Sequence, residues 1–113
     1  MKTESLKKHY EFKRVYKKGH SVVGRYLVIY FLRNKTAQNH YGVTVSKKVG
    51  KSVIRSRVRR LIKENLRKFE EQIPPGYDIV IVARVAAAKA DYHKIGRNME
   101  ELLKGYLKKQ VKS

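Results

Sequence analysis

Alternating apolar and polar positions predict two strands in the first half of the chain. Residues 26–32 read YLVIYFL, and residues 40–46 read HYGVTVS. Successive side chains of a strand point to opposite faces, so each segment has one mainly apolar face. These apolar faces consist of Leu27, Ile29 and Phe31 in one segment and Tyr41, Val43 and Val45 in the other. Polar residues separate the two segments, and we expect the strands to form a hairpin.

Two further strands are expected. Residues 77–83 read YDIVIVA and are largely apolar on both faces, which is typical of a central, fully buried strand. Residues 20–23 are short and favour an edge strand. No internal repeat or low-complexity linker interrupts the chain.

Three segments follow the helical period. The first covers residues 6–18 and ends at Gly19, a residue suited to ending a helix. In the second, apolar positions recur from residue 54 to residue 73, until Pro74-Pro75-Gly76 stops the helix. The third runs from Asp91, an expected N-cap, to Val111. The pattern predicts one domain over residues 1–113, an α+β sandwich with helices packed on one mainly antiparallel sheet.

Net charge narrows the choice of partner. The 113 residues include 28 Lys and Arg against 9 Asp and Glu, which gives a formal charge of +19. Self-repulsion on this scale opposes folding, and a nucleic acid is the natural partner that neutralises it. No apolar run has the length of a membrane span, and residues 1–12 contain no apolar signal segment. With no cysteine in the chain, nothing argues for export, and the cytoplasm is expected.

The helix over residues 54–73 has two unlike faces. At about 100° per residue its apolar side chains share one arc, formed by Ile54, Val58, Leu61, Ile62, Leu66, Phe69 and Ile73. Nearly opposite lie Ser56, Arg59, Arg60, Lys63 and Arg67. Arg57 and Lys68 lie on a flank with Glu64, and Arg55 lies at the helix start. A charged helix face is usually in contact with solvent alone, but a face of that kind carries both acidic and basic residues. Here the three arginines and the lysine stand together with no acid between them. Phosphates would relieve their repulsion.

A basic loop precedes this helix and contains Lys47, Lys48 and Lys51. Gly50-Lys51-Ser52 resembles the end of a phosphate-binding P-loop, but the first glycine of that motif would fall at Val45. A nucleotide-hydrolysing P-loop is therefore rejected. A phosphate is still expected to bind favourably at the N-terminus of the basic helix.

The sequence offers no catalytic or metal-binding constellation. The adjacent acids Glu70 and Glu71, like Glu100 and Glu101, diverge by about 100° on their helices. The four histidines are scattered without the spacing of metal ligands. We therefore predict no catalytic residues and no metal site in this chain.

Aromatic residues form a second candidate surface. Phe12 and Tyr16 share a helix face at an i,i+4 spacing, and Tyr26 and Tyr30 share a strand face. Aromatic rings bordered by Lys and Arg suit unpaired nucleotides, which offer base faces to stack and phosphates to neutralise. The alternative is that these rings belong to the core, which is the usual fate of Phe.

The segments LKKHYEFKRVYKKG, YLVIYFL, VTVSKKVGKSVIRSRVRRLIKENLR and YDIVIVAR resemble the protein subunit of bacterial ribonuclease P over almost the whole chain. The family signature, an RNR-type basic helix after a Lys/Gly loop, falls here on Arg55, Ser56, Arg57, Arg59, Arg60 and Lys63. Ser56 stands where the family usually has Asn, Arg59 where Lys is common, and Lys63 where Arg is common. The loop reads Gly-Lys-Ser instead of the usual Gly-Asn-Ala. Charge is kept at each basic position, whereas Ser56 cannot make any interaction of the Asn amide.

The resemblance implies an α-β sandwich with an unusual left-handed β-α-β crossover. It also implies that a large RNA subunit, with Mg²⁺, removes the 5′ leader from precursor tRNA. The residues expected to face the catalytic RNA are Lys47, Lys48, Lys51, Arg55, Ser56, Arg57, Arg59, Arg60, Lys63 and Arg67. Phe12, Tyr16 and Tyr30 are expected to hold the single-stranded leader. A basic ribosomal or ribosome-assembly protein and a nuclease acting alone are the alternatives.

Overall fold

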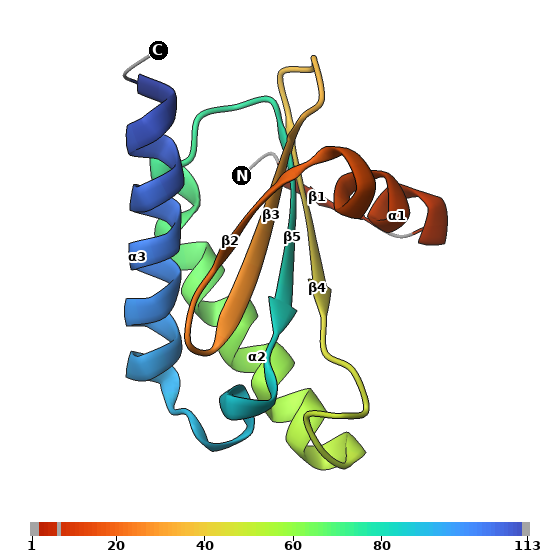
Figure 1. The fold of residues 1–113 in the computed structure, drawn as a ribbon, viewed down its shortest axis with the longest axis vertical. Helices are drawn as coiled ribbons and strands as arrows, with labels where there is room; N and C mark the ends of the chain where they lie inside the picture. The colour runs from red at the N-terminus through yellow and green to blue at the C-terminus, as the bar shows by residue number, and fades with distance from the viewer. Residues whose placement is uncertain (1–2, 7, 112–113) are drawn as a thin grey trace.

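The computed structural model describes residues 3–6 and 8–111, which form five strands and three long helices (Figure 1). Their bounds are β1 Thr3–Ser5, α1 His9–Lys18, β2 His20–Val23, β3 Leu27–Arg33, β4 Asn39–Thr44, α2 Ser52–Phe69, β5 Tyr77–Ala83 and α3 Tyr92–Val111. Short 3-10 helices at Glu70–Gln72 and Val85–Lys89 follow α2 and β5. Every predicted helix and strand is present. The strand at Thr3–Ser5 and the 3-10 helix at Val85–Lys89 were not predicted.

The first helix begins later than its sequence pattern indicates. The expected start at residue 6 is wrong, because the Leu6 amide donates to the Tyr41 carbonyl at 2.8 Å and continues the pairing of β1 with β4. Position 7, also within the expected helix, lies outside the described residues. The third helix does have the expected N-cap, because Asp91 Oδ1 accepts a 2.8 Å hydrogen bond from the Lys94 amide. The same hydrogen bond is the main cause that lowers the pKa of Asp91.

The expected hairpin between the two alternating strands does not form. The sheet order is β1-β4-β5-β3-β2, so β5 lies between β3 and β4. Strand β5 is parallel to β4 and antiparallel to β3, and β4 is also parallel to β1. The sheet is therefore mixed, not mainly antiparallel. A strand that is apolar on both faces is most stable at the centre of a sheet, and Tyr77, Ile79, Val80 and Ile81 are all buried there.

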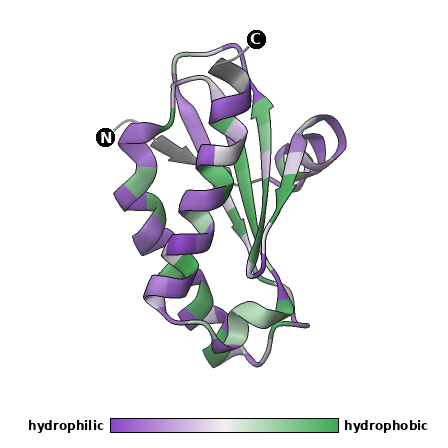
Figure 2. Cartoon of the chain, turned by 60° about the vertical axis from the view of Figure 1, so that its left-hand side comes forward, coloured by the Kyte–Doolittle hydropathy of each residue, from purple (hydrophilic) through white to green (hydrophobic). Residues whose placement is uncertain are grey.

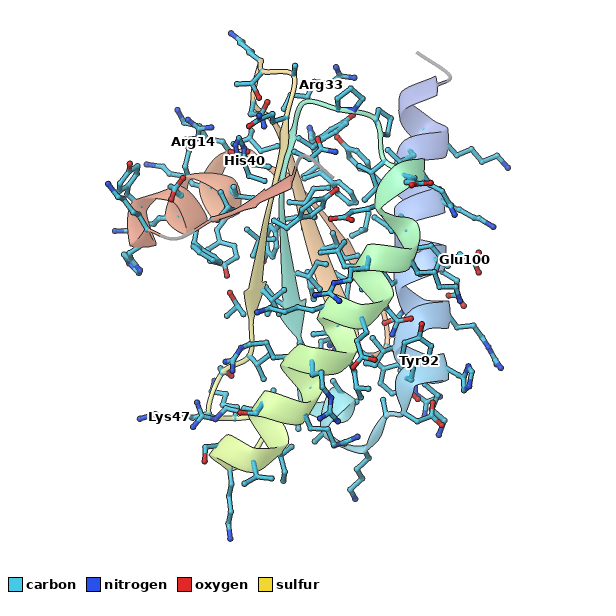
Figure 3. All side chains as sticks on the ribbon, turned by 180° about the vertical axis from the view of Figure 1, so that it is seen from behind. Arg14, Arg33, His40, Lys47, Tyr92 and Glu100 are labelled. Carbon is cyan, nitrogen blue, oxygen red and sulfur yellow. The ribbon has the colours of Figure 1, made fainter. Side chains whose placement is uncertain are left out.

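Helix α2 connects the neighbouring parallel strands β4 and β5 and makes a β-α-β crossover. Figure 3 shows α2 in front of the sheet, both strands running downward, and β5 to the right of β4. Seen from this side, a right-handed crossover would place the second strand, β5, to the left of the first strand, β4. Because β5 lies to the right, this crossover is left-handed. Such crossovers are rare, since about 98% are right-handed. The arrangement agrees with the one that the family resemblance implied.

Helices cover both faces of the sheet. On one face, α2 and α3 bury the apolar side of β3 and β5, with Leu27, Ile29 and Phe31 all fully buried as predicted. The predicted apolar face of α2 also lies in this core, through Val58, Leu61, Ile62, Leu66 and Phe69. Hydrophilic positions dominate the outward sides of α2 and α3 in Figure 2. The other face carries α1 over a smaller cluster of Leu6, Val15 and Val80.

Candidate RNA interface

The exposed side of α2 is a continuous cationic surface. Ser56, Arg59, Arg60, Lys63, Glu64 and Arg67 line an open hollow of about 620 Å³. We call these residues the cationic face. Four cations there stand against one carboxylate, and Arg60 Nε lies 3.5 Å from Glu64 Oε1. Lys68, which lies on the flank with Glu64, has its Nζ atom 5.5 Å from the ring centre of Phe69. The helical wheel thus places these side chains correctly, and their binding of RNA stays a prediction.

The loop before α2 presents three lysines from a fixed backbone. Lys47, Lys48 and Lys51 are exposed, while Val45 and Val49 are buried. Gly50 has a φ of +156°, and a Cβ at this position would lie 3.0 Å from the Ile54 side chain. A glycine is therefore required where the loop approaches the first turn of α2.

Two of the residues predicted to bind RNA, Arg55 and Arg57, turn toward the protein backbone. The Arg55 Nε atom donates to the Gly50 carbonyl at 3.1 Å and ties the basic loop to the helix. Arg57 Nη1 donates to the Ala90 carbonyl at 3.3 Å, and Arg57 Nη2 donates to the Ala88 carbonyl. Both arginines are half-buried. The structure therefore separates them from the cationic face, although a guanidinium with five donors keeps others for a ligand.

The three predicted leader-binding residues come together on the opposite face of the sheet. The rings of Tyr16 and Tyr30 meet edge to face with centroids 4.9 Å apart, and Tyr16 Oη lies 2.9 Å from Thr44 Oγ1. Phe12 packs on Gly42, where a Cβ would come within 2.5 Å of the ring. Tyr16 is 37% exposed, whereas Phe12 and Tyr30 are half-buried. Phe12 therefore belongs partly to the core, and these three residues make up what we call the aromatic surface.

A row of smaller side chains extends the aromatic surface across the sheet. Val23, Val28, Val82 and Thr44 are paired in register over four strands. None of them is fully buried, and Val23 is 64% exposed. Helix α1 lies beside the upper part of the sheet in Figure 1, and all four side chains of the row keep some exposure to solvent. Sequence reasoning missed the row, although the alternation of β3 already placed Val28 beside Tyr30.

A buried carboxylate holds α1 against the sheet. Asp78 on β5 is 6% exposed. Its Oδ1 atom accepts hydrogen bonds from Asn34 Nδ2 at 2.9 Å and from His40 Nδ1 at 2.8 Å, and its Oδ2 atom accepts one from Arg14 Nη2 at 3.2 Å. Arg14 and His40 lie close together where α1 meets the sheet (Figure 3). Since the same helix carries Phe12 and Tyr16, this network sets the position of the aromatic surface.

Among residues 3–6 and 8–111, no three His, Asp or Glu side chains gather as candidate metal ligands. In that part of the chain, no helix combines the length and hydropathy that a membrane span requires. The positively charged and aromatic surfaces are therefore the features on which a functional assignment must rest.

Comparison with known proteins agrees with this geometry. A sequence profile of the Ribonuclease P family matches residues 1–107. The ribonuclease P protein component of Clostridioides difficile is 49% identical over 104 residues, which are 91% of each chain. The solved RNase P protein of Staphylococcus aureus is 38% identical with a TM-score of 0.82, and the match covers 88% of this chain and 92% of that one. The RNase P protein of Thermotoga maritima is 28% identical with a TM-score of 0.80, covering 89% and 96%.

The likeness covers about nine tenths of the chain and is not limited to the basic helix. The family profile matches nearly all of the sequence, and the relatives have about the same length as this chain. This chain therefore belongs to the ribonuclease P protein family.

Proposed function

We propose that this chain binds two RNAs at once, the catalytic RNA on the cationic face and basic loop and the 5′ leader of precursor tRNA on the aromatic surface. As a member of its family, it is the protein subunit of an endoribonuclease that acts in tRNA processing. The location we propose is the cytoplasm, on the basis of a cysteine-free sequence.

One observation carries the proposal: the two surfaces lie on opposite sides of the sheet and differ in chemistry. The cationic face lies on α2, which covers one face of the sheet, while the aromatic surface lies between α1 and the other face. Lys and Arg side chains bind phosphates without regard to sequence or strandedness. Aromatic rings require unstacked bases, which a single-stranded leader supplies and a folded RNA mostly does not.

In this arrangement the protein acts by binding and orientation. Two RNAs repel each other, and cations between them reduce that repulsion while releasing condensed counterions. Tyr16 and Tyr30 would stack leader bases, and the Val28 and Val82 side chains would support them from the sheet. The hydrolysis is assigned to the RNA subunit with Mg²⁺, because the described residues of this chain offer no converging set of carboxylates.

The decisive experiment combines precursor tRNA with the protein alone, with catalytic RNA alone, and with both, at low Mg²⁺ concentration. We expect cleavage to be strong only in the mixture. Cleavage by the protein alone would contradict the proposal, and a mixture no faster than the RNA alone would favour a general RNA-binding role such as ribosome assembly.

A salt titration tests the cationic face directly. In the triple variant Arg59→Ala, Arg60→Ala, Lys63→Ala, we expect the slope of log affinity for catalytic RNA against log salt to flatten by about 0.7–0.9 per phosphate that the protein no longer neutralises. The control removes three cations from α3, through Lys104→Ala, Lys108→Ala and Lys109→Ala, and leaves the same net charge. If both variants show the same slope, the cationic face has no special role.

A further inference from the structure

A second cluster of cations lies at the β2–β3 turn, away from the surfaces described above. Arg25 on the turn and Lys94 and Arg97 on α3 line an open hollow of about 410 Å³, together with a single acid, Glu101. We call it the turn hollow. It shares no residue with the hollow of the cationic face. In Figure 1 the β2–β3 turn lies beside the lower half of α3.

Side chains from elsewhere in the fold hold this turn open. The Gly24 amide donates to the Leu27 carbonyl at 2.8 Å. The Leu27 amide, however, donates to Asn98 Oδ1 at 3.0 Å, and the Tyr26 amide donates to the same oxygen at 2.9 Å. The Gly24 carbonyl accepts from Arg84 Nη1 at 2.6 Å. Because α3 and the end of β5 bind the turn backbone, Arg25 is held next to α3 and is not on a free loop.

The floor of the turn hollow has an unused donor. Asn98 lines the hollow and is only 6% exposed. Its oxygen is occupied by two backbone amides, whereas its Nδ2 group has no hydrogen-bond acceptor among the described residues. A Cβ at Gly24 would lie 2.3 Å from this nitrogen, so the turn approaches it as closely as a glycine allows. Among the described residues, the enclosed side-chain atoms that lack a partner are Asn65 Oδ1 and Glu70 Oε2, so Asn98 Nδ2 is not sealed off and water or a ligand in the turn hollow can reach it.

The cations around this donor also have no acidic partner among the described residues. In the part of the chain that the structure describes, Arg25, Lys94 and Arg97 form no ion pair within 4.0 Å. Arg97 and Glu101 are four residues apart on α3, yet they do not pair. The guanidinium of Arg25 lies 5.4 Å from the ring centre of Tyr26, within the range of a cation–π contact.

We infer that the turn hollow binds a phosphate of an RNA backbone, as an interaction additional to those of the proposed function, on which the inference rests. Three cations against one acid attract an anion, and two guanidinium groups match the oxygens of a phosphate. The Asn98 Nδ2 group supplies a further donor from below. The phosphate would come from either the catalytic RNA or the leader of precursor tRNA.

The test uses the variant Arg25→Ala with Arg97→Ala in full-length protein. The control, Lys108→Ala with Lys109→Ala, removes the same charge from exposed positions of α3 outside the turn hollow. A second variant, Arg25→Lys with Arg97→Lys, keeps both charges. Circular dichroism and thermal melting verify that all variants fold. One arm measures the salt dependence of binding to catalytic RNA, and the other measures holoenzyme binding to precursor tRNA with a long leader and to mature tRNA.

For the alanine variant we expect the salt slope to flatten by about 0.7–0.9 for each phosphate that is no longer bound, with the lysine variant close to wild type and the control unchanged. A change in the first arm identifies the catalytic RNA as the source, and a change confined to leader-bearing precursor identifies the leader. Unchanged slopes in both arms, or an equal change in the control, would overturn the inference. The Arg59, Arg60 and Lys63 triple variant serves as reference: if its slope changes while that of Arg25→Ala with Arg97→Ala does not, only this inference fails. If neither changes, the proposed function fails as well.

Discussion

Replacing Asp78 with Asn should loosen α1 and weaken leader binding without affecting the cationic face. The side chain of Asp78 is 8% exposed and accepts hydrogen bonds from Arg14, Asn34 and His40. An amide of the same shape keeps one acceptor oxygen. Its NH₂ group must then face either Arg14 or the pair of Asn34 and His40, so at least one donor is left opposite another donor.

The cost can be divided between the two carboxylate oxygens. The Arg14 side chain is 52% exposed, so solvent screening limits its ion pair with Asp78 to about 0.5–1 kcal/mol. The bonds from Asn34 and His40 are less exposed, and losing them costs about 1–2 kcal/mol. The total is about 1.5–3 kcal/mol of unfolding free energy, which corresponds to a fall of roughly 10 °C in Tm for a domain of this size.

Urea unfolding followed by circular dichroism measures this cost. A double-mutant cycle of Asp78→Asn with Arg14→Ala should give a coupling energy of about 0.5–1 kcal/mol. The control is Lys13→Ala, which removes a neighbouring exposed cation of α1. In the binding assay, affinity for leader-bearing precursor should fall while the salt slope for catalytic RNA stays constant. A destabilisation below about 0.5 kcal/mol, or a coupling energy of zero, would refute the view that Asp78 anchors α1.

Three further predictions concern single side chains. Tyr30→Ala should weaken binding of leader-bearing precursor by about 1–3 kcal/mol if the ring stacks a base, and an equal loss for mature tRNA would place Tyr30 in a purely structural role. Burial raises the pKa of Tyr106 to about 12, above its unfolded value of about 10. The stability that Tyr106 contributes is therefore complete below pH 10 and lost as the pH rises toward 12; Tyr106→Phe should unfold less steeply over this range in an alkaline titration. Ile62→Ala should cost about 2–5 kcal/mol in urea unfolding, because this fully buried side chain packs between α2 and the sheet.

Periodic signals in the sequence predicted the helices and faces of this fold well. The α2 wheel separated buried Val58 and Ile62 from exposed Arg60 and Lys63 because a long helix repeats its pattern over several turns. The alternation of β3 likewise placed Ile29 in the core. Strand β1 carries no such signal, since its three residues are polar in the sequence and the strand forms by pairing with the distant β4.

Contacts between distant segments were beyond the reach of sequence patterns. The Arg14–Asp78 pair joins residues 64 positions apart, and Arg57 reaches carbonyls more than 30 residues away. Alternation also says which way a side chain points but not which strand is the neighbour. The expected hairpin failed for this reason: β5 is buried on both faces and takes the place between β3 and β4.

The left-handed crossover decides whether an aromatic surface can exist at all. With β4 and β5 in their observed order, a right-handed connection would place α2 on the other face of the sheet, over Tyr30 and Thr44. That face carries hydroxyl groups and the Asp78 carboxylate, which an apolar helix would desolvate at a cost. The opposite face offers Ile29, Phe31, Ile79 and Ile81, all fully buried under α2 and α3. Burial of α2 against the purely apolar face therefore outweighs the ordinary preference for handedness. As a consequence, the cationic face lies on one side of the sheet and the uncovered aromatic surface lies on the other.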